Sequence, residues 1–209
     1  MMQRILTEKE AEDFLEKNGF KIVKRAFAKS LANLKKITKK ISFPWVMKAS
    51  SRDIVHKAKS GGVILNIRSL EEAESSFSKL SKLKEFEEAI IQETISGEEI
   101  IIGLKKTPEF GVVLLFGHGG SKVEEEKDIA FRIPPLKEID IEELIKDIRF
   151  YKIIEQKCLN LNELKKVLMK TAKLSKKYKN ITELDINPLI INSKEAQIVD
   201  ARIVLEDGL

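Results

Sequence analysis

The chain has 209 residues, 43% hydrophobic and 34% charged, which predicts a folded protein with one large domain or two smaller lobes. Its net charge is +5, but lysines are mixed with glutamates along helical stretches and form no basic block, so we expect no nucleic-acid partner. The single cysteine excludes an internal disulfide framework and a multi-cysteine metal site. Because no apolar run is long enough to span a membrane and the start turns charged at once, we expect a cytoplasmic protein without a signal peptide.

The first part of the chain alternates helical and extended patterns. Thr7 and Glu10 form a capping box, and Ser69 with Glu72 repeats this helix-start signal. In order, the predicted elements are a helix at 7–18, a strand at 21–28, a helix at 31–41, a strand ending at residue 48, a strand at 63–67 and a helix from 69 to about 84.

The second part contains more strands. Two are predicted within residues 88–104 around a turn at Ser96-Gly97. There follow a strand at 111–116, a glycine cluster, a strand at 129–133, helices at about 140–150 and 161–178, and strands at 181–191 and 196–205. This order predicts an α+β fold with two lobes, residues 1–92 and 93–209.

A lysine and two glycines near the centre of the first lobe suggest a phosphate site. Lys48 ends an apolar run, and lysines are rarely buried unless they are paired. Gly61-Gly62 follows in the next loop; such a pair is common in hairpin turns, but its free N–H groups can also bind phosphate. His56 lies in the loop between Lys48 and the glycine pair, and a neutral imidazole is a possible nucleophile at cellular pH.

A second glycine cluster, FGHGG, occupies residues 116–120. Gly117, Gly119 and Gly120 are more glycines than one turn requires, which favours another phosphate-facing loop with Arg132 as a charge partner. His118 within the cluster rivals His56 as the nucleophile, and spacing alone does not decide between them.

The C-terminal strands carry the strongest geometric argument. Asp185 and Asn187 are two residues apart and therefore share one face of a strand. If the turn centres on Ser193-Lys194, antiparallel pairing places Asn187 opposite Asp200, with Cβ atoms roughly 5 Å apart. Three oxygen-bearing side chains suit Mg²⁺ better than the alternative of a solvated polar face, because the flanking residues are apolar.

The predicted lobe boundary carries two glutamates. Glu93 interrupts an apolar strand, and Glu99 follows the turn at Gly97. Either side chain could simply be exposed. At a hinge, backbone groups from Gln92 to Thr94 could pair with an adenine edge while a glutamate binds the ribose hydroxyls.

These motifs, in this order, resemble the ATP-grasp fold and, more narrowly, the β subunit of ADP-forming (NDP-forming) acyl-CoA synthetase. The resemblance covers nearly the whole chain. The matching motifs are MKASSRDIVHKAKSGGVILNI, QETISGEEIIIG, EFGVVLLFGHGGSKVEEEKDIAFRIPPL, and ELDINPLII followed by IVDARIVL.

The resemblance implies a reaction in which acyl-CoA, ADP and phosphate interconvert with acid, CoA and ATP. It also implies a CoA-binding α subunit as partner, ATP/ADP and Mg²⁺ as cofactors, and two lobes that clasp the nucleotide. The family's HK-x-x-x-GG motif matches at His56, which favours His56 over His118 as the phosphoryl carrier. By the same resemblance, Lys48 contacts nucleotide phosphates, Glu93 lies at the adenine hinge, Glu99 lies at the ribose, and Asn187 and Asp200 are Mg²⁺ ligands with Asp185 close by.

The chain departs from the family pattern at His118, at Ser121-Lys122 and at EQKCLN, where a Gly-x-Arg-Gly turn is usual. Two alternatives remain open at this point. One is another ATP-grasp ligase that activates a carboxylate, and the other is a non-catalytic basic module that binds nucleic acid or protein.

Overall fold

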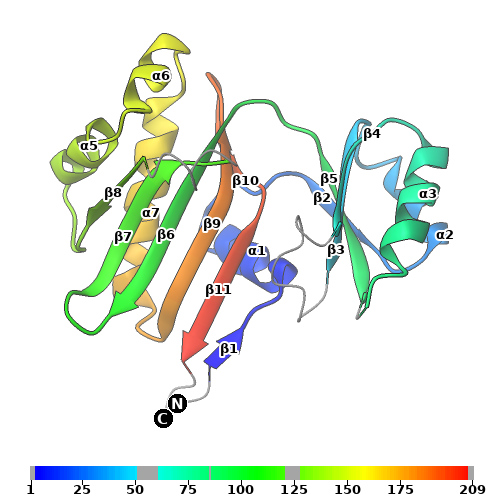
Figure 1. Ribbon diagram of the computed structural model, residues 1–209, viewed down its shortest axis with the longest axis horizontal. Helices are drawn as coiled ribbons and strands as arrows, with labels where there is room; N and C mark the ends of the chain where they lie inside the picture. Colours follow the sequence, from blue (N-terminus) through cyan, green and yellow to red (C-terminus); the bar gives the residue numbers. More distant parts are fainter. Residues whose placement is uncertain (1–2, 51–60, 85, 121–127, 207–209) are drawn as a thin grey trace. The chain divides into compact units, whose positions relative to one another are not determined.

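The computed structural model describes residues 3–50, 61–84, 86–120 and 128–206 (Figure 1). The chain separates into two compact units, each described here by itself. The smaller unit is Val23–Ile95, and the larger unit combines Met1–Ile22 with Ser96–Leu209. Both contain sheets and helices, so the predicted α+β class is confirmed.

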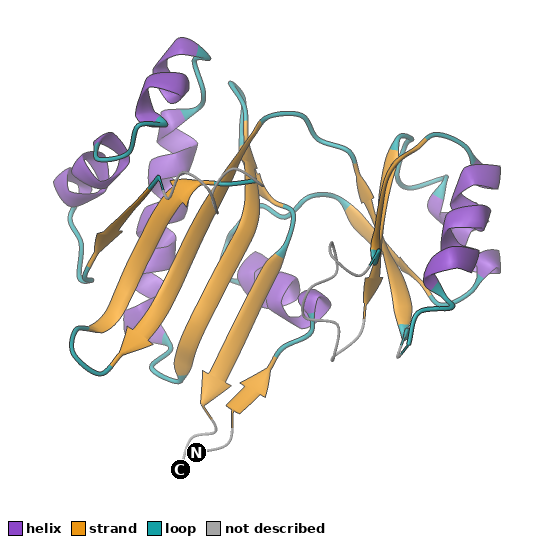
Figure 2. Cartoon of the chain, in the orientation of Figure 1, coloured by secondary structure: helices purple, strands orange, loops and turns teal. Residues whose placement is uncertain are grey.

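The smaller unit is built on a four-stranded sheet, sheet B, with strand order β2-β5-β3-β4. Its helices cover one face, where a hydrophobic core forms around Trp45, Met47 and Ile91 (Figure 2). The elements are β2 (Arg25–Ala28), α2 (Leu31–Ile37), β3 (Trp45–Ser50), β4 (Val63–Ile67), α3 (Leu70–Leu80) and β5 (Glu88–Glu93).

The larger unit is built on a seven-stranded sheet, sheet A, with the order β1-β11-β9-β6-β7-β8 and β10 paired to β9. Its strands are β1 (Gln3–Ile5), β6 (Glu98–Thr107), β7 (Gly111–His118), β8 (Ile129–Arg132), β9 (Ile181–Ile191), β10 (Ala196–Ile198) and β11 (Ala201–Glu206). Its helices are α1 (Glu8–Lys17), α5 (Glu138–Lys146), α6 (Tyr151–Gln156) and α7 (Leu161–Lys177). No helix in the described ranges has both the length and the apolar character needed to cross a membrane.

One face of sheet A packs on α1 and α7 and forms the main core (Figure 2). Even-numbered residues of β6, such as Ile100, Ile102 and Leu104, point into this core and are almost fully buried. The opposite face is named here the open face, because no helix of the larger unit's described residues covers it. The odd-numbered residues of β6 lie on this face, since side chains alternate along a strand.

The first residues of the chain join the larger unit, which differs from the predicted lobe of residues 1–92. β1 pairs antiparallel with β11, and α1 buries Ala11 and Leu15 completely in the core of the larger unit. The Ile198 N–H donates to the Lys21 carbonyl at 2.9 Å. Long-range pairing therefore outweighs chain order, and the observed boundaries fall after Ile22 and Ile95.

Most predicted elements are present, with shifts at their ends. The strand predicted at 21–28 is extended only over Arg25–Ala28. The helix predicted at about 140–150 is present as α5, and a further short helix that was not predicted, α6, follows it. Asp128 explains the second helix start, because its carboxylate accepts both the Arg149 and the Phe150 N–H groups at 2.8 Å.

Trp45 is the largest apolar anchor of the smaller unit. Its side chain is 0% exposed, its indole N–H donates to the Ile41 carbonyl at 3.1 Å, and its ring stacks on Phe43 with centroids 4.1 Å apart. We expect Trp45→Ala to lower the free energy of unfolding by about 3–5 kcal/mol, measured by urea denaturation. The matched control is Leu65→Ala, because Leu65 lies in the same sheet but is 67% exposed, and we expect a change within about 0.5 kcal/mol. Equal effects of the two substitutions would contradict this role for Trp45.

Candidate functional site

Lys48 and Gln92 lie on one face of sheet B, away from α2 and α3. In the β3–β5 register, Lys48 pairs with Ile90 and Val46 pairs with Gln92, and directly paired residues share a face. Both polar side chains are nearly inaccessible, at 4% exposed for Lys48 and 1% for Gln92. Lys48 therefore lies inside a strand that continues to Ser50, and its charge is buried as its sequence context suggested.

Glu93 lies on the other face of sheet B. It pairs with Trp45, whose indole is part of the helix-covered core. The Glu93 N–H donates to the Lys24 carbonyl at 3.1 Å, and the Thr94 N–H donates to the Pro44 carbonyl at 3.2 Å. An adenine contact through this backbone segment would therefore have to use groups other than these two N–H groups.

The loop before β4 is described only from Gly61 onward. Gly61 has φ +71°, a left-handed conformation that favours glycine, and a Cβ there would meet no atom within 4 Å. The Gly62 carbonyl accepts a hydrogen bond from the Ala49 N–H at 2.8 Å, which anchors the end of the loop to β3. His56 lies outside the described residues, and its role stays a prediction.

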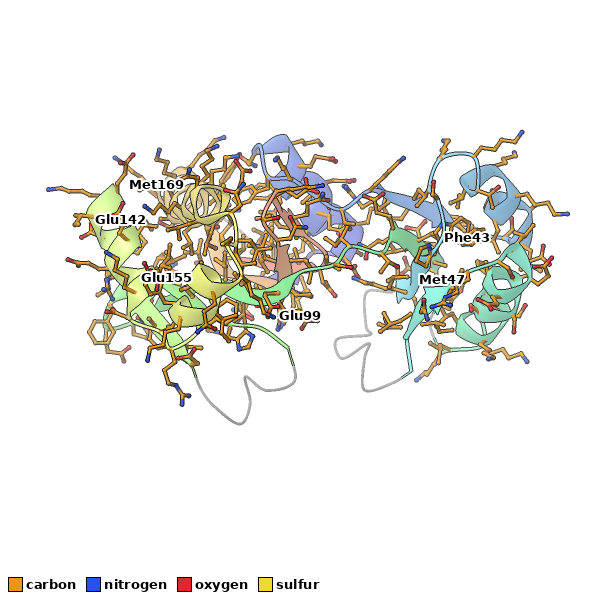
Figure 3. The ribbon with its side chains drawn as sticks, turned by 90° about the horizontal axis from the view of Figure 1, so that it is seen from above. Phe43, Met47, Glu99, Glu142, Glu155 and Met169 are labelled. Carbon is orange, nitrogen blue, oxygen red and sulfur yellow. The ribbon has the colours of Figure 1, made fainter. Side chains whose placement is uncertain are left out.

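In the larger unit, the glycine cluster lies beside Glu99. The Gly119 N–H donates to the Glu99 carbonyl at 2.7 Å, and a Cβ on Gly119 would meet the Glu99 carbonyl carbon at 2.8 Å. A Cβ on Gly117 would likewise lie 2.8 Å from the Asp128 carbonyl oxygen. Close strand packing alone thus accounts for glycine at positions 117 and 119. Glu99 is exposed and lies on the side of sheet A opposite Met169 of α7 (Figure 3).

His118 points to the helix-covered face of sheet A. It pairs with Ile100, a core residue, and its ring stacks on Phe150 with centroids 4.1 Å apart and planes 14° apart. Its imidazole therefore packs on the opposite side of the sheet from Glu99. This packing gives His118 a structural explanation that needs no catalytic role.

Arg132 also faces the helices. It pairs with Leu114 of the core, and its guanidinium forms an ion pair with Asp147 at 2.7 Å. The alternation along β8 instead places Phe131 on the open face, opposite Leu115. Arg132, predicted as the charge partner of a phosphate-facing loop, therefore lies on the helix-covered face and is paired with Asp147.

The predicted register of the C-terminal strands is confirmed. Leu189 pairs with Ile198 and Ile186 pairs with Ala201, and the Asn187 N–H donates to the Asp200 carbonyl at 3.1 Å. Asn187 therefore lies opposite Asp200. With Asp185, these side chains belong to the open face, because the intervening residues are buried in the core.

The electrostatics around Asp185 favour a cation. Burial raises the pKa of its carboxyl group above the usual range, and the neighbouring Glu183 carboxylate raises it further, while Arg202 acts in the opposite direction. Two carboxylates and a carboxamide are the hard oxygen donors that Mg²⁺ prefers. Among the described residues, no group of three or more His, Cys, Asp or Glu side chains is arranged to hold a metal ion by itself. Mg²⁺ usually completes its coordination with water and substrate phosphates.

Two residues of this face were not singled out from the sequence. Gly103 of β6 pairs with Asp185 on one side and with Leu115 on the other, so the β6 residue directly beside Asp185 has no side chain. Arg202 of β11 pairs with Asp185 from the opposite direction. The register that was predicted for Asn187 and Asp200 also places Arg202 opposite Asp185, and this was the signal available in the sequence.

Comparisons with known proteins bear on this arrangement. Residues 1–205 match the model of the ATP-grasp domain family. The chain is 33% identical to acetate–CoA ligase [ADP-forming] I subunit β of Pyrococcus furiosus, an alignment that covers 97% of this chain and 92% of the relative. It is 37% identical to acetate–CoA ligase [ADP-forming] II of Archaeoglobus fulgidus, but it spans only 30% of the length of that protein.

Solved structures agree with these relatives. Acetyl-coenzyme A synthetase 1 of Ca. Korarchaeum cryptofilum, in complex with coenzyme A, Ca-AMPCP and HgCl⁺, superposes with a TM-score of 0.91 at 33% identity, covering 97% of this chain and 94% of that chain. A second structure of that enzyme, with Mg-AMPPCP and a phosphohistidine segment that points towards the nucleotide binding site, gives a TM-score of 0.84 at 32% identity and covers 97% and 93% of the two chains. The chain therefore belongs to the ATP-grasp family and is a homologue of the β subunits of ADP-forming acetate–CoA ligases.

Proposed function

We propose that this chain is the nucleotide-binding β subunit of an ADP-forming acyl-CoA synthetase. It transfers a phosphoryl group between His56 and ADP or ATP, in the overall reaction acyl-CoA + ADP + phosphate = acid + CoA + ATP. The observation that carries this proposal is the register of β9 on β11, which gathers Asp185, Asn187 and Asp200 on one face of a sheet. The β-subunit relatives in Pyrococcus furiosus, which this chain matches over almost their whole length, support it.

Candidate nucleotide-binding groups occur in each unit, considered by itself. In the smaller unit, the Lys48 ammonium binds phosphate as a point charge, and the N–H groups of Gly61 and Gly62 face the phosphate chain. In the larger unit, Asn187, Asp200 and Asp185 would hold Mg²⁺, which when bound neutralises phosphate charge and orients the phosphate oxygens. In this proposal Glu99 binds the ribose hydroxyls; Gly119 and Gly120 lie beside it.

The remaining chemistry belongs to one imidazole. Phosphorylated His56 carries the phosphoryl group to ADP, where the N–P bond breaks as a bond forms from a terminal ADP oxygen to phosphorus. The electron pair of the N–P bond returns to the ring nitrogen, so the imidazole is neutral and ready to accept the next phosphoryl group. The protein's contribution is mainly positioning and charge neutralisation.

A separate α subunit completes the synthetase in this proposal. The relatives in Pyrococcus furiosus are named subunit β, and the longer Archaeoglobus fulgidus relative contains about three times the length that this chain spans. The additional length matches the need for a CoA site and an acid site. We also propose that the protein is cytoplasmic, the location expected from its sequence.

Ligand-dependent stability tests the nucleotide site directly. ADP with Mg²⁺ at 100 times its dissociation constant should stabilise the folded protein by about 2.7 kcal/mol, seen as a higher melting temperature. ATP formation from acyl-CoA, ADP and phosphate should then require the α subunit. An unchanged melting temperature over the full range of ADP and Mg²⁺ concentrations would refute the nucleotide site.

A further inference from the structure

Arg202 occupies a central position on the open face of sheet A. It lies on β11, pairs directly with Asp185 and follows Asp200 by two residues, so all three side chains share this face. Its side chain retains 39% exposure. An arginine is thus placed beside the residues proposed to hold Mg²⁺.

The guanidinium of Arg202 is only weakly satisfied within the protein. Its Nη1 donates to Glu183 Oε1 at 3.4 Å, which is long for a charged hydrogen bond. Its Nε is buried and has no hydrogen-bond acceptor in the described part of the chain. A buried donor without an acceptor is costly, so a ligand that supplies an anionic oxygen here would be stabilised.

Glu183 compensates Arg202 only partly, because it also binds a second cation. It pairs across β6 with Lys105, and the two side chains form a direct ion pair. Glu183 is therefore shared: one carboxylate oxygen contacts Lys105 and the other makes only the 3.4 Å contact with Arg202. Next to Asp185, Gly103 of β6 contributes no side chain to the open face.

We infer that Arg202 binds a phosphate oxygen of the nucleotide, next to the cation site formed by Asn187 and Asp200. This inference rests on the proposed function. A guanidinium presents several donors in a fixed plane, which suits the oxygens of a diphosphate. The competing explanation is that Arg202 only offsets the negative charge of the neighbouring carboxylates, without touching the ligand.

The two explanations predict different effects of an Arg202 substitution on the affinities for ADP and for adenosine. Affinities for ADP and for adenosine are measured by calorimetry at saturating Mg²⁺, on folded variants of matched melting temperature. If Arg202 contacts phosphate, Arg202→Met should lower the affinity for ADP by about 10- to 100-fold and leave the affinity for adenosine unchanged. Arg202→Lys keeps the charge but not the fork of donors, and should restore part of the affinity for ADP.

Lys106→Met is the matched control, because it also removes one cation from sheet A. Lys106 lies near the end of β6, and its side chain forms an ion pair with Glu206 at 2.7 Å. Because side chains alternate along a strand, Lys106 lies on the opposite face of the sheet from Lys105. We expect its affinity for ADP to stay within about twofold of the wild type. An equal loss in Lys106→Met and Arg202→Met would show a general charge effect and overturn the inference.

A second pair of variants tests the same site without changing Arg202. Lys105→Met releases Glu183, which can then approach Arg202 and compete with the phosphate, so affinity for ADP should fall several-fold. Adding Glu183→Gln to that variant should restore it, because the competitor is neutral.

The outcomes separate this inference from the proposed function. If the wild type binds ADP and Arg202→Met binds it equally well, Arg202 does not contact phosphate. If Arg202→Met loses affinity for ADP and for adenosine to the same extent, Arg202 has a structural role, and this result would also overturn the inference. A wild type that binds no ADP would refute the proposed function itself.

Discussion

His56→Ala is expected to abolish phosphoryl transfer, with a loss of about 10⁴-fold or more, while Mg-ADP still binds with wild-type affinity. The imidazole is the proposed carrier, and no water or neighbouring group can replace a nucleophile that must form and break a covalent bond. Two measurements check this: ATP formation by the reconstituted synthetase, and acid-labile label on the β subunit after incubation with labelled ATP.

His118→Ala is the matched control. His118 stacks on Phe150 on the helix-covered side of sheet A, so its loss should reduce stability modestly and leave labelling intact. The assignment of the carrier would be reversed if His118→Ala lost the label and His56→Ala kept it. Loss of Mg-ADP binding in His56→Ala would instead indicate that His56 supports the nucleotide site structurally.

Asp200→Asn is expected to weaken Mg²⁺-dependent binding of ADP by about 100-fold. The substitution removes a carboxylate from the proposed Mg²⁺ ligands but keeps the size and shape of the side chain. The strand register should survive, since Asn187 bonds to the main-chain carbonyl of residue 200 and not to its side chain. The measurement is a titration of ADP at several Mg²⁺ concentrations, in which the wild type gains affinity with Mg²⁺ and the variant gains much less.

Asp147→Asn makes the same chemical change away from the open face. Asp147 is the ion-pair partner of Arg132, so its replacement should leave ADP affinity within about twofold of the wild type. The metal assignment fails if Asp200→Asn keeps the full Mg²⁺ dependence, or if the two variants lose affinity equally.

Local sequence signals were sufficient for much of the fold. The Thr7–Glu10 capping box is present as predicted, with the Glu10 N–H donating to the Thr7 hydroxyl at 3.2 Å. The C-terminal pairing was also predictable, because a short turn leaves one register that buries the apolar face. Position 56, by contrast, is a prediction from a motif and lies outside the described residues.

The sequence by itself determined the α+β class, most element positions and the hairpin that places Asn187 opposite Asp200, since these depend on side-chain alternation and neighbouring turns. Only the tertiary structure decided that residues 1–22 belong with the second half of the chain, because β1 must pair with a strand some 200 residues away. It also decided that Arg132 and His118 face the helices, because the direction of these side chains follows from the sheet position and pairing of their strands.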